Sequence, residues 1–217
     1  MGRHDKPKSL KRSRGNRKEK TVIALFTEGE VTEVEYFNAI RRLPAIRERF
    51  RLDIEDLHGA PSKLMKAAIH MKRADKEVDQ CWCVFDVEWP KSNPKAHHPG
   101  VEDVLRDADG RKGIECAVSN PTFELWLILH HKLERRALLN EKAEDERHQL
   151  DGSKGKSLDG VRGKIRYDGD WYVGNVSTAC RNALKLNQLH ENNANRFPEN
   201  NPSSSVAHLM QVLGLDC

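Results

Sequence analysis

Short apolar runs alternate along the first 133 residues with longer segments whose apolar positions recur every three or four residues. Runs of β-forming residues predict strands at 21–26, 51–57, 81–87 and 114–118. The helical spacing between and after them predicts helices near 32–43, 62–71 and 120–133. Because strand–helix alternation is typical of βαβ units, this pattern predicts an α/β fold with a mainly parallel sheet flanked by helices.

The pattern changes after residue 133. We expect a highly charged helical segment at 134–150, a glycine-containing loop at 151–170, a helix at 176–189, a polar loop at 192–205 and a short closing helix at 202–213. The predicted organisation is therefore a basic arm at 1–20, an α/β core at 21–133 and a helical and loop extension at 134–217 that packs on the core.

The charge is concentrated at the N-terminal end of the chain. Residues 1–20 contain nine Lys or Arg and two acids, a formal charge of +7, so the rest of the +4 chain carries −3. A basic segment with few apolar residues cannot bury enough surface to fold alone, and it can attract phosphates. We expect a disordered arm, which is either a nucleic-acid contact or only a solubilising tail.

The composition excludes some classes of protein. Five cysteines with no CxxC pair argue against a disulfide framework and against a zinc site. Cys81 and Cys83 fall within an apolar run and are expected to be buried thiols. No apolar run approaches the roughly 20 residues of a membrane span, and the N-terminus lacks the apolar stretch of a signal peptide. The expected location is the cytoplasm, without membrane contact.

Acidic residues follow two of the predicted strands. Glu28 follows the first strand, and Asp86 and Glu88 end the third. Ligands of parallel sheets bind beyond the carboxyl ends of the strands, and residues i and i+2 of a strand point to the same side. Converging carboxylates repel one another unless a cation joins them, and Mg²⁺ needs only one or two carboxylates plus water and phosphate. These acids are therefore candidate metal ligands, although a single acid at a strand end is usually only a solvated turn residue.

Several other polar residues are weaker candidates for a catalytic or metal-binding role. Glu124 is expected in the first turn of the helix after the fourth strand, as a catalytic base or ligand or only as a favourable partner of the helix dipole. Glu33 has the same ambiguity. Asn120 is expected to cap that helix, although Ser119 and Asn120 could also position a phosphate or a water. His97 and His98 fall in a loop beside the acids, where a histidine could donate a proton to a leaving group but is more often merely exposed.

Two further groups of cations could be structural or functional. His130 and His131 are expected at a helix end, where a positive charge is favourable. A basic run in the 151–170 loop could bind a nucleic-acid backbone or simply be solvated. The candidate nucleic-acid ligands in that run are Lys154, Lys156, Arg162 and Lys164.

Three motifs together resemble a known family. Glu28-Gly29 followed by Thr32-Glu33, with Asp86 and Glu88 after a later strand, resembles the Toprim pattern. The stretch Ser-Asn-Pro-Thr-Phe-Glu-Leu-Trp at 119–126 and the stretch Asn-Pro-Ser-Ser-Ser-Val at 201–206 resemble the second and third signatures of RloB-like proteins. The resemblance extends over about residues 21–213, and the stretch at 119–126 is its most specific part.

The resemblance implies a Toprim-like fold, chemistry with Mg²⁺ or Mn²⁺, and a role in defence against phage. It implies a nuclease acting on RNA or DNA, including tRNA, with Glu28 as general acid/base or metal ligand. A defence-system ATPase or other subunit is an implied partner, and an oligomer is compatible with the sequence. Glu88 stands where the family pattern has a second aspartate, which puts the metal geometry in question.

Two alternatives to a nuclease remain. One is a Toprim-like module that binds nucleic acid or a nucleotide and regulates a partner without cutting. The other is a primase or topoisomerase fragment. This alternative is the least favoured, because the chain is short and because none of its three tyrosines, Tyr36, Tyr167 and Tyr172, has the sequence context of a strand-transfer tyrosine.

Overall fold

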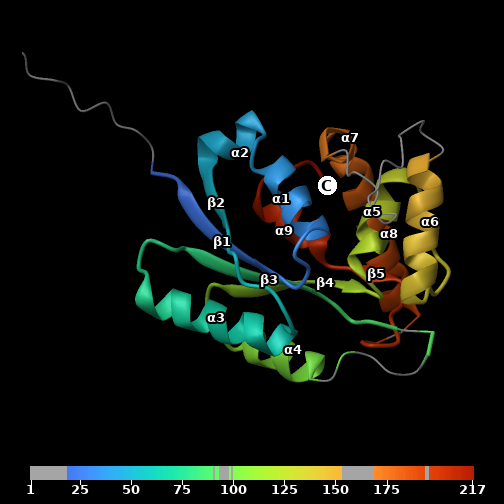
Figure 1. Ribbon diagram of the computed structural model, residues 1–217, viewed down its shortest axis with the longest axis horizontal. Coiled ribbons are helices and arrows are strands. Elements are labelled where there is room, and N and C mark those ends of the chain that lie inside the picture. Colours follow the sequence, from blue (N-terminus) through green and yellow to red (C-terminus); the bar gives the residue numbers. More distant parts are fainter. Residues whose placement is uncertain (1–18, 90, 93–97, 99, 153–168, 194–195) are drawn as a thin grey trace, which may run out of the picture.

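The fold is a single sheet with helices on both faces, seen in a computed structural model (Figure 1). The structure describes residues 19–89, 91–92, 98, 100–152, 169–193 and 196–217. The strands are β1 (Thr21–Thr27), β2 (Phe50–Ile54), β3 (Gln80–Asp86), β4 (Ile114–Asn120) and β5 (Ser203–Ser204). The helices are α1 (Thr32–Ile40), α2 (Pro44–Arg49), α3 (Pro61–Ala74), α4 (Val101–Asp109), α5 (Phe123–His131), α6 (Asn140–Gly152), α7 (Gly169–Gly174), α8 (Val176–Asn192) and α9 (Val206–Val212).

The strand order is β2-β1-β3-β4-β5. The first four strands are parallel, and β5 pairs antiparallel with β4 at the edge. The predicted α/β fold with a mainly parallel sheet is confirmed, and it is consistent with a Toprim-like fold. The antiparallel β5 was not expected, because its two residues lie in a segment whose composition predicts a polar loop.

Each strand divides its side chains between two hydrophobic clusters. Val22, Ala24 and Phe26 of β1 face α3 and α4, whereas Ile23 and Leu25 face the larger cluster on the other side. That larger side is covered by α1, α5, α8 and α9, as Figure 1 shows. Burial on both faces explains why β1 and β3 are almost wholly apolar.

The C-terminal region is built into the same core as the first strands. Buried residues of α8 and α9 belong to the larger hydrophobic cluster, together with residues of β1 and β3. The backbone N–H of Ser205 also donates to the carbonyl of Val118 at 2.9 Å. The segment that follows residue 133 thus completes the sheet edge beside the end of β4.

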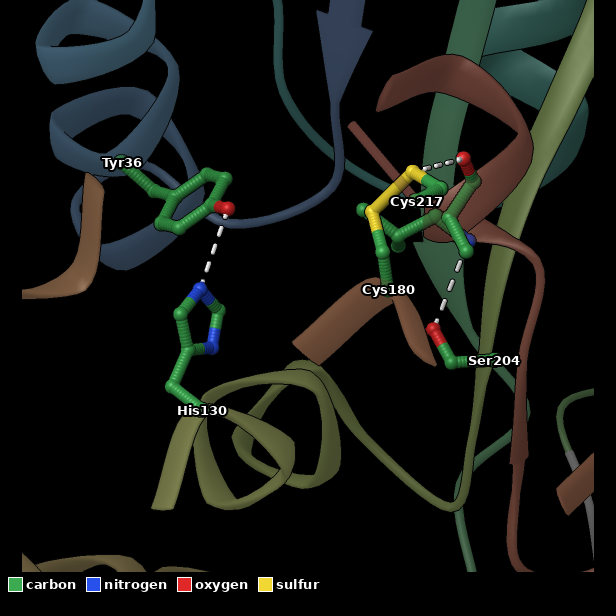
Figure 2. Close-up of a disulfide and its surroundings, with 7 residues drawn as sticks. Tyr36, His130, Cys180, Ser204 and Cys217 are labelled. Carbon is green, nitrogen blue, oxygen red and sulfur yellow. Dashed lines mark hydrogen bonds between the residues drawn. A yellow bond between two sulfur atoms is a disulfide. The ribbon is translucent and has the colours of Figure 1, made fainter. Parts of the chain in front are cut away.

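One disulfide joins α8 to the chain end, between Cys180 and Cys217, whose Cα atoms are 4.7 Å apart (Figure 2). The cysteine pattern argues against a disulfide framework, but the fold brings together these two cysteines, which are 37 residues apart in sequence. Cys81 and Cys83 are buried free thiols, as expected. None of the helices in the described ranges is both long enough and apolar enough to cross a bilayer.

Candidate active site

Glu28 and Asp86 meet at the carboxyl ends of the two central strands. Because β1 and β3 are parallel neighbours, the residue after β1 lies beside the end of β3. The backbone N–H of Glu28 donates to the carbonyl of Val84 at 2.9 Å, and the backbone N–H of Asp86 donates to Oε2 of Glu28 at 3.0 Å. The expectation that these two acids share one edge of the sheet is confirmed.

Glu33 joins this pair from the first turn of α1. Its residue is only 6% exposed, and the backbone N–H of Gly29 donates to its Oε1 at 3.2 Å. Burial, together with the charges of Glu124 and Glu28, raises the pKa of Glu33 to about 7. Sequence reasoning left Glu33 ambiguous, since an acid in the first turn of a helix needs no function.

Gly29 is required by this arrangement. A Cβ on residue 29 would lie 2.7 Å from Oε1 of Glu33, closer than non-bonded atoms approach. The φ of Gly29 does not lie in the left-handed region, so glycine is needed here for space and not for an unusual backbone conformation.

Asp86 lies at the centre of the carboxylates. Burial of its carboxyl raises its pKa well above the usual range, and the charges of Glu33, Glu124 and Glu28 raise it further. The backbone N–H of Phe123, at the start of α5, donates to the carboxyl and partly opposes this rise. Asp86 is therefore an acid that lies at the N-terminus of α5, close to three other carboxylates.

Glu88 lies near Glu28, but its position does not follow from the alternation of strand β3 that the sequence predicts. Strand β3 ends at Asp86, and Glu88 adopts a left-handed backbone with φ 64°, so the alternation of a strand does not apply to it. Its backbone N–H donates to the carbonyl of Pro121 at 2.9 Å. The charge of Glu88 raises the pKa of Glu28. Non-glycine residues in this backbone region occur often at functional sites.

His98 lies against Glu28. Its Nε2 is 3.7 Å from Oε1 of Glu28, and each side chain is 19% exposed. The expectation of an exposed histidine is wrong, because the backbone N–H of His98 donates to the carbonyl of Val87 and so holds residue 98 against the sheet edge. Burial raises the pKa of Glu28, whereas the Asp86 N–H and the positive charge on His98 oppose that rise.

Asn120 forms the wall of the site at β4 and does not cap a helix. Helix α5 begins at Phe123, after Thr122, so the capping prediction is wrong. Oδ1 of Asn120 accepts from Nε1 of Trp89 at 2.6 Å, and this bond ties the segment after Glu88 to the end of β4. Ser119, the neighbour of Asn120, is the register partner of Asp86 across the sheet.

A family model places the chain among known proteins. The model for the family described as "RloB: RloB-like protein" matches residues 23–213. The chain belongs to the RloB-like protein family. Comparison with curated proteins and with solved structures gave no significant match.

The carboxylates of this RloB-like protein offer oxygen ligands to a metal ion. Carboxylate oxygens crowded at one point suit a hard divalent cation. Within the described residues, however, no three His, Cys, Asp or Glu side chains are arranged so that they could hold one ion together. Since Mg²⁺ keeps several waters and is often held by one or two carboxylates plus substrate phosphates, the chemistry fits an ion that is completed by water and substrate.

The structure of the RloB-like protein therefore brings together most of the acids that the sequence singled out. Glu28, Asp86 and Glu124 interact, Glu88 acts on Glu28, and Glu33 joins them. The candidate nucleic-acid ligands Lys154, Lys156, Arg162 and Lys164 lie outside the described residues, as do His97 and residues 1–18.

His130 is a core residue of the RloB-like protein, not a cation at a helix end. Its Nδ1–H donates to the carbonyl of Trp126 at 2.9 Å. Its Nε2 accepts from the Tyr36 hydroxyl at 3.2 Å, the contact drawn in Figure 2. Burial lowers the pKa of His130 to about 3. The expected interaction of a positive His130 with the helix dipole is therefore wrong. His131 instead contacts Asp151, with Nε2 and Oδ1 3.1 Å apart.

Proposed function

We propose that this RloB-like protein is a divalent-metal-dependent nuclease that hydrolyses phosphodiester bonds of RNA or DNA. The observation that supports this most directly is the position of Asp86 among Glu28, Glu33 and Glu124 at the carboxyl ends of the strands. Burial raises the pKa of Asp86, the charges of the neighbouring carboxylates raise it further, and a bound cation would offset the cost of ionising this acid. Such an edge is where open α/β sheets bind their ligands.

One or two of the candidate ligands Asp86, Glu28 and Glu88 would hold Mg²⁺ or Mn²⁺, and water and a substrate phosphate would complete its coordination. The ion, when bound, stabilises charge on the phosphodiester and lowers the pKa of an attacking water. The chain itself holds Glu28 ready as a proton acceptor, because the Asp86 N–H fixes Oε2 while Oε1 faces His98. A protonated His98 stabilises the ionised form of Glu28, which is the form that accepts a proton.

Glu124 is the second catalytic candidate. It lies in the first turn of α5, and its charge acts on both Glu33 and Asp86. A carboxylate there can accept or donate a proton beside Asp86. Glu33, whose pKa is about 7, can hold a proton near neutral pH and so limits the negative charge of the group.

The biological role that fits this chemistry is defence against phage by cleavage of nucleic acid, including tRNA, in the cytoplasm. This role rests on the family resemblance, as does a partnership with a defence-system ATPase or another subunit. The alternative is a module that binds nucleic acid or a nucleotide and regulates a partner without cutting.

Incubating the pure protein with tRNA and with plasmid DNA distinguishes these functions. We expect cleavage in Mg²⁺ or Mn²⁺, none in EDTA, and none by Asp86→Ala. The matched control is Asp109→Ala, which removes an exposed carboxylate at the end of α4 and should cleave like the wild type. Binding without cleavage would support the regulatory module, and full cleavage by Asp86→Ala would place the metal elsewhere.

A further inference from the structure

A second site lies beside the carboxylates, on the β5 side of β4. It is a pocket of about 320 Å³ whose walls come from α4, α8, the end of β4 and the segment before β5. Its walls combine apolar and amide side chains, chiefly Leu105, Val118, Phe197, Asn120, Asn187 and Asn200. None of the carboxylates described above lines this pocket.

The side-chain amide of Asn120 makes three hydrogen bonds within the wall of the pocket. Its Oδ1 accepts from Trp89, and its Nδ2 donates both to the carbonyl of Pro198 at 2.8 Å and to Oδ1 of Asn200 at 2.9 Å. Asn120 therefore leaves no donor for a ligand. It fixes the rim of the pocket relative to the segment after Glu88.

Two other amides each keep one polar end for a ligand. Asn187 uses Nδ2 to donate to the carbonyl of Ser204 at 3.0 Å, and Asn200 uses Oδ1 to accept from Asn120. Among the described residues, Oδ1 of Asn187 and Nδ2 of Asn200 have no hydrogen-bond partner. Because the opposite end of each amide is anchored, the pocket presents an oriented acceptor and an oriented donor.

The remaining walls suit a flat ring. Phe197 is half-buried and offers an aromatic surface, and Leu105 and Val118 add apolar contact. Proteins recognise unpaired nucleobases by stacking them on aromatic side chains and by hydrogen-bonding their edges. The volume is at the lower end of the range of about 300–1,000 Å³ for small-molecule sites, which suits one base or nucleoside. Neither Lys nor Arg is among the described residues that line it, so a phosphate group has no cation to attract it there.

We propose that this pocket binds one nucleobase of a single-stranded nucleic acid, next to the phosphate that lies at the carboxylates. Every nucleobase has an edge on which a donor stands beside an acceptor, as the two amides require. Asn120 follows Ser119, the register partner of Asp86, so base and backbone would occupy adjacent positions along the sheet edge. The role of the pocket in substrate positioning rests on the proposed nuclease function, but binding of the base itself does not.

Nucleosides without phosphate test the pocket alone. The full chain in EDTA is titrated with adenosine, guanosine, cytidine and uridine, and saturation-transfer NMR and calorimetry measure binding. We expect at least one nucleoside to bind and to shift the side-chain amide resonances of Asn187 and Asn200 in the wild type. Absence of binding by all four nucleosides, or binding that leaves both amide signals unmoved, would overturn the proposal.

Matched variants locate the contact. Asn200→Asp keeps the oxygen that accepts from Asn120 but replaces the free donor by an acceptor, and Phe197→Leu removes the aromatic surface. Each should weaken nucleoside binding at least about fivefold, in line with the loss of a hydrogen bond or a stacking contact. Asn192→Asp adds the same charge at an exposed position of α8 outside the pocket and should bind like the wild type. Equal affinity of Asn200→Asp and wild type would contradict the assignment, and thermal melting shows that each variant is folded.

The outcomes separate this pocket from the nuclease proposal. If the protein binds nucleosides through Asn200 but cleaves nothing in Mg²⁺, the proposal for the pocket stands and the nuclease proposal is contradicted. If the protein cleaves nucleic acid in Mg²⁺ but binds no nucleoside, the nuclease proposal stands and the proposal for the pocket is contradicted.

Discussion

The carboxylate of Glu33 occupies the space that a Cβ on residue 29 would fill. The backbone N–H of Gly29 donates to that carboxylate, and a Cβ there would lie 2.7 Å from Oε1 and 2.8 Å from Cδ of Glu33. The loop after β1 and the first turn of α1 are thus joined by a contact that only glycine permits. The position of Glu33 among the acids depends on this contact.

Gly29→Ala should displace Glu33 and disturb the carboxylates. Forcing an extra methyl group into a packed site costs about 1–3 kcal/mol, so we expect the free energy of unfolding in urea to fall by that amount. Metal-dependent cleavage, if the proposed function holds, should fall as well. The control is Gly110→Ala, where an added Cβ would meet nothing within 4 Å. Equal stability of Gly29→Ala and wild type would mean that Glu33 moves aside without cost.

Mg²⁺ should stabilise the protein through Asp86. A ligand that binds only the folded state at 100 times its Kd adds about 2.7 kcal/mol, which is measured as a higher melting temperature. Asp86→Asn keeps an acceptor for the Phe123 N–H and removes one of the repelling charges, so its stability without metal should equal or exceed that of the wild type. The variant should lose the Mg²⁺ effect. The same Mg²⁺-induced shift in Asp86→Asn and wild type would place the ion away from this group.

The strand pattern was enough to predict the sheet and the meeting of Glu28 with Asp86. In a parallel sheet the ends of neighbouring strands coincide, so position in sequence fixes position in space. His98 could not be predicted, because its place depends on a backbone bond from its loop to Val87. Strand β5 has two residues and no apolar pattern of its own, and its pairing with β4 depends on packing of the C-terminal region. The sequence around Asn120 predicts a helix cap, because its actual partners, Trp89 and Asn200, are distant in sequence.

Acid should destabilise the fold through His130. Its pKa falls from the ordinary value of 6.5 to about 3 in the folded protein, so the unfolded chain binds a proton more readily. The stability that the neutral imidazole provides is complete above pH 6.5 and is lost as the pH falls toward 3, at up to about 1.4 kcal/mol per pH unit. His130→Gln should flatten this part of the stability–pH curve, measured by urea unfolding between pH 7 and 4. His70→Gln, at an exposed position of α3, is the control and should keep the wild-type slope.

Reduction of the disulfide should lower stability without unfolding the protein. Cys180 and Cys217 are separated by 37 residues, and closing a loop of that length removes unfolded-state entropy worth about 3–4 kcal/mol. Cys217→Ser, or the wild type in dithiothreitol, should lose a similar amount of unfolding free energy, and dithiothreitol should not affect the variant. Burial raises the pKa values of Cys81 and Cys83, so these thiols should not react in the folded state. Alkylation of all five cysteines in the unfolded, unreduced protein would show that the disulfide is absent.

The basic arm should contribute to substrate affinity and not to the chemistry. Residues 1–18 contain eight Lys or Arg and one Asp, and they lack aromatic residues that could stack on bases. Strand β1 begins at Thr21, and Nζ of Lys20 donates to the carbonyl of Arg47, so a deletion that ends at residue 18 leaves the first strand and this contact intact. Cations that neutralise phosphates release counterions, and the logarithm of the binding constant then falls with the logarithm of the salt concentration by about 0.7–0.9 per phosphate contacted.

Deleting residues 1–18 should therefore weaken nucleic-acid binding at low salt and flatten its salt dependence. The rate at saturating substrate should stay the same, because Glu28, Asp86 and Glu88 remain in place. A chain of full length whose arm has Gln in place of each Lys and Arg is the matched control, since it removes the charge and keeps the length. If both changed proteins bind like the wild type at low salt, the arm is a solubilising tail. A lower rate at saturation would instead mean that the arm reaches the carboxylates and takes part in the reaction.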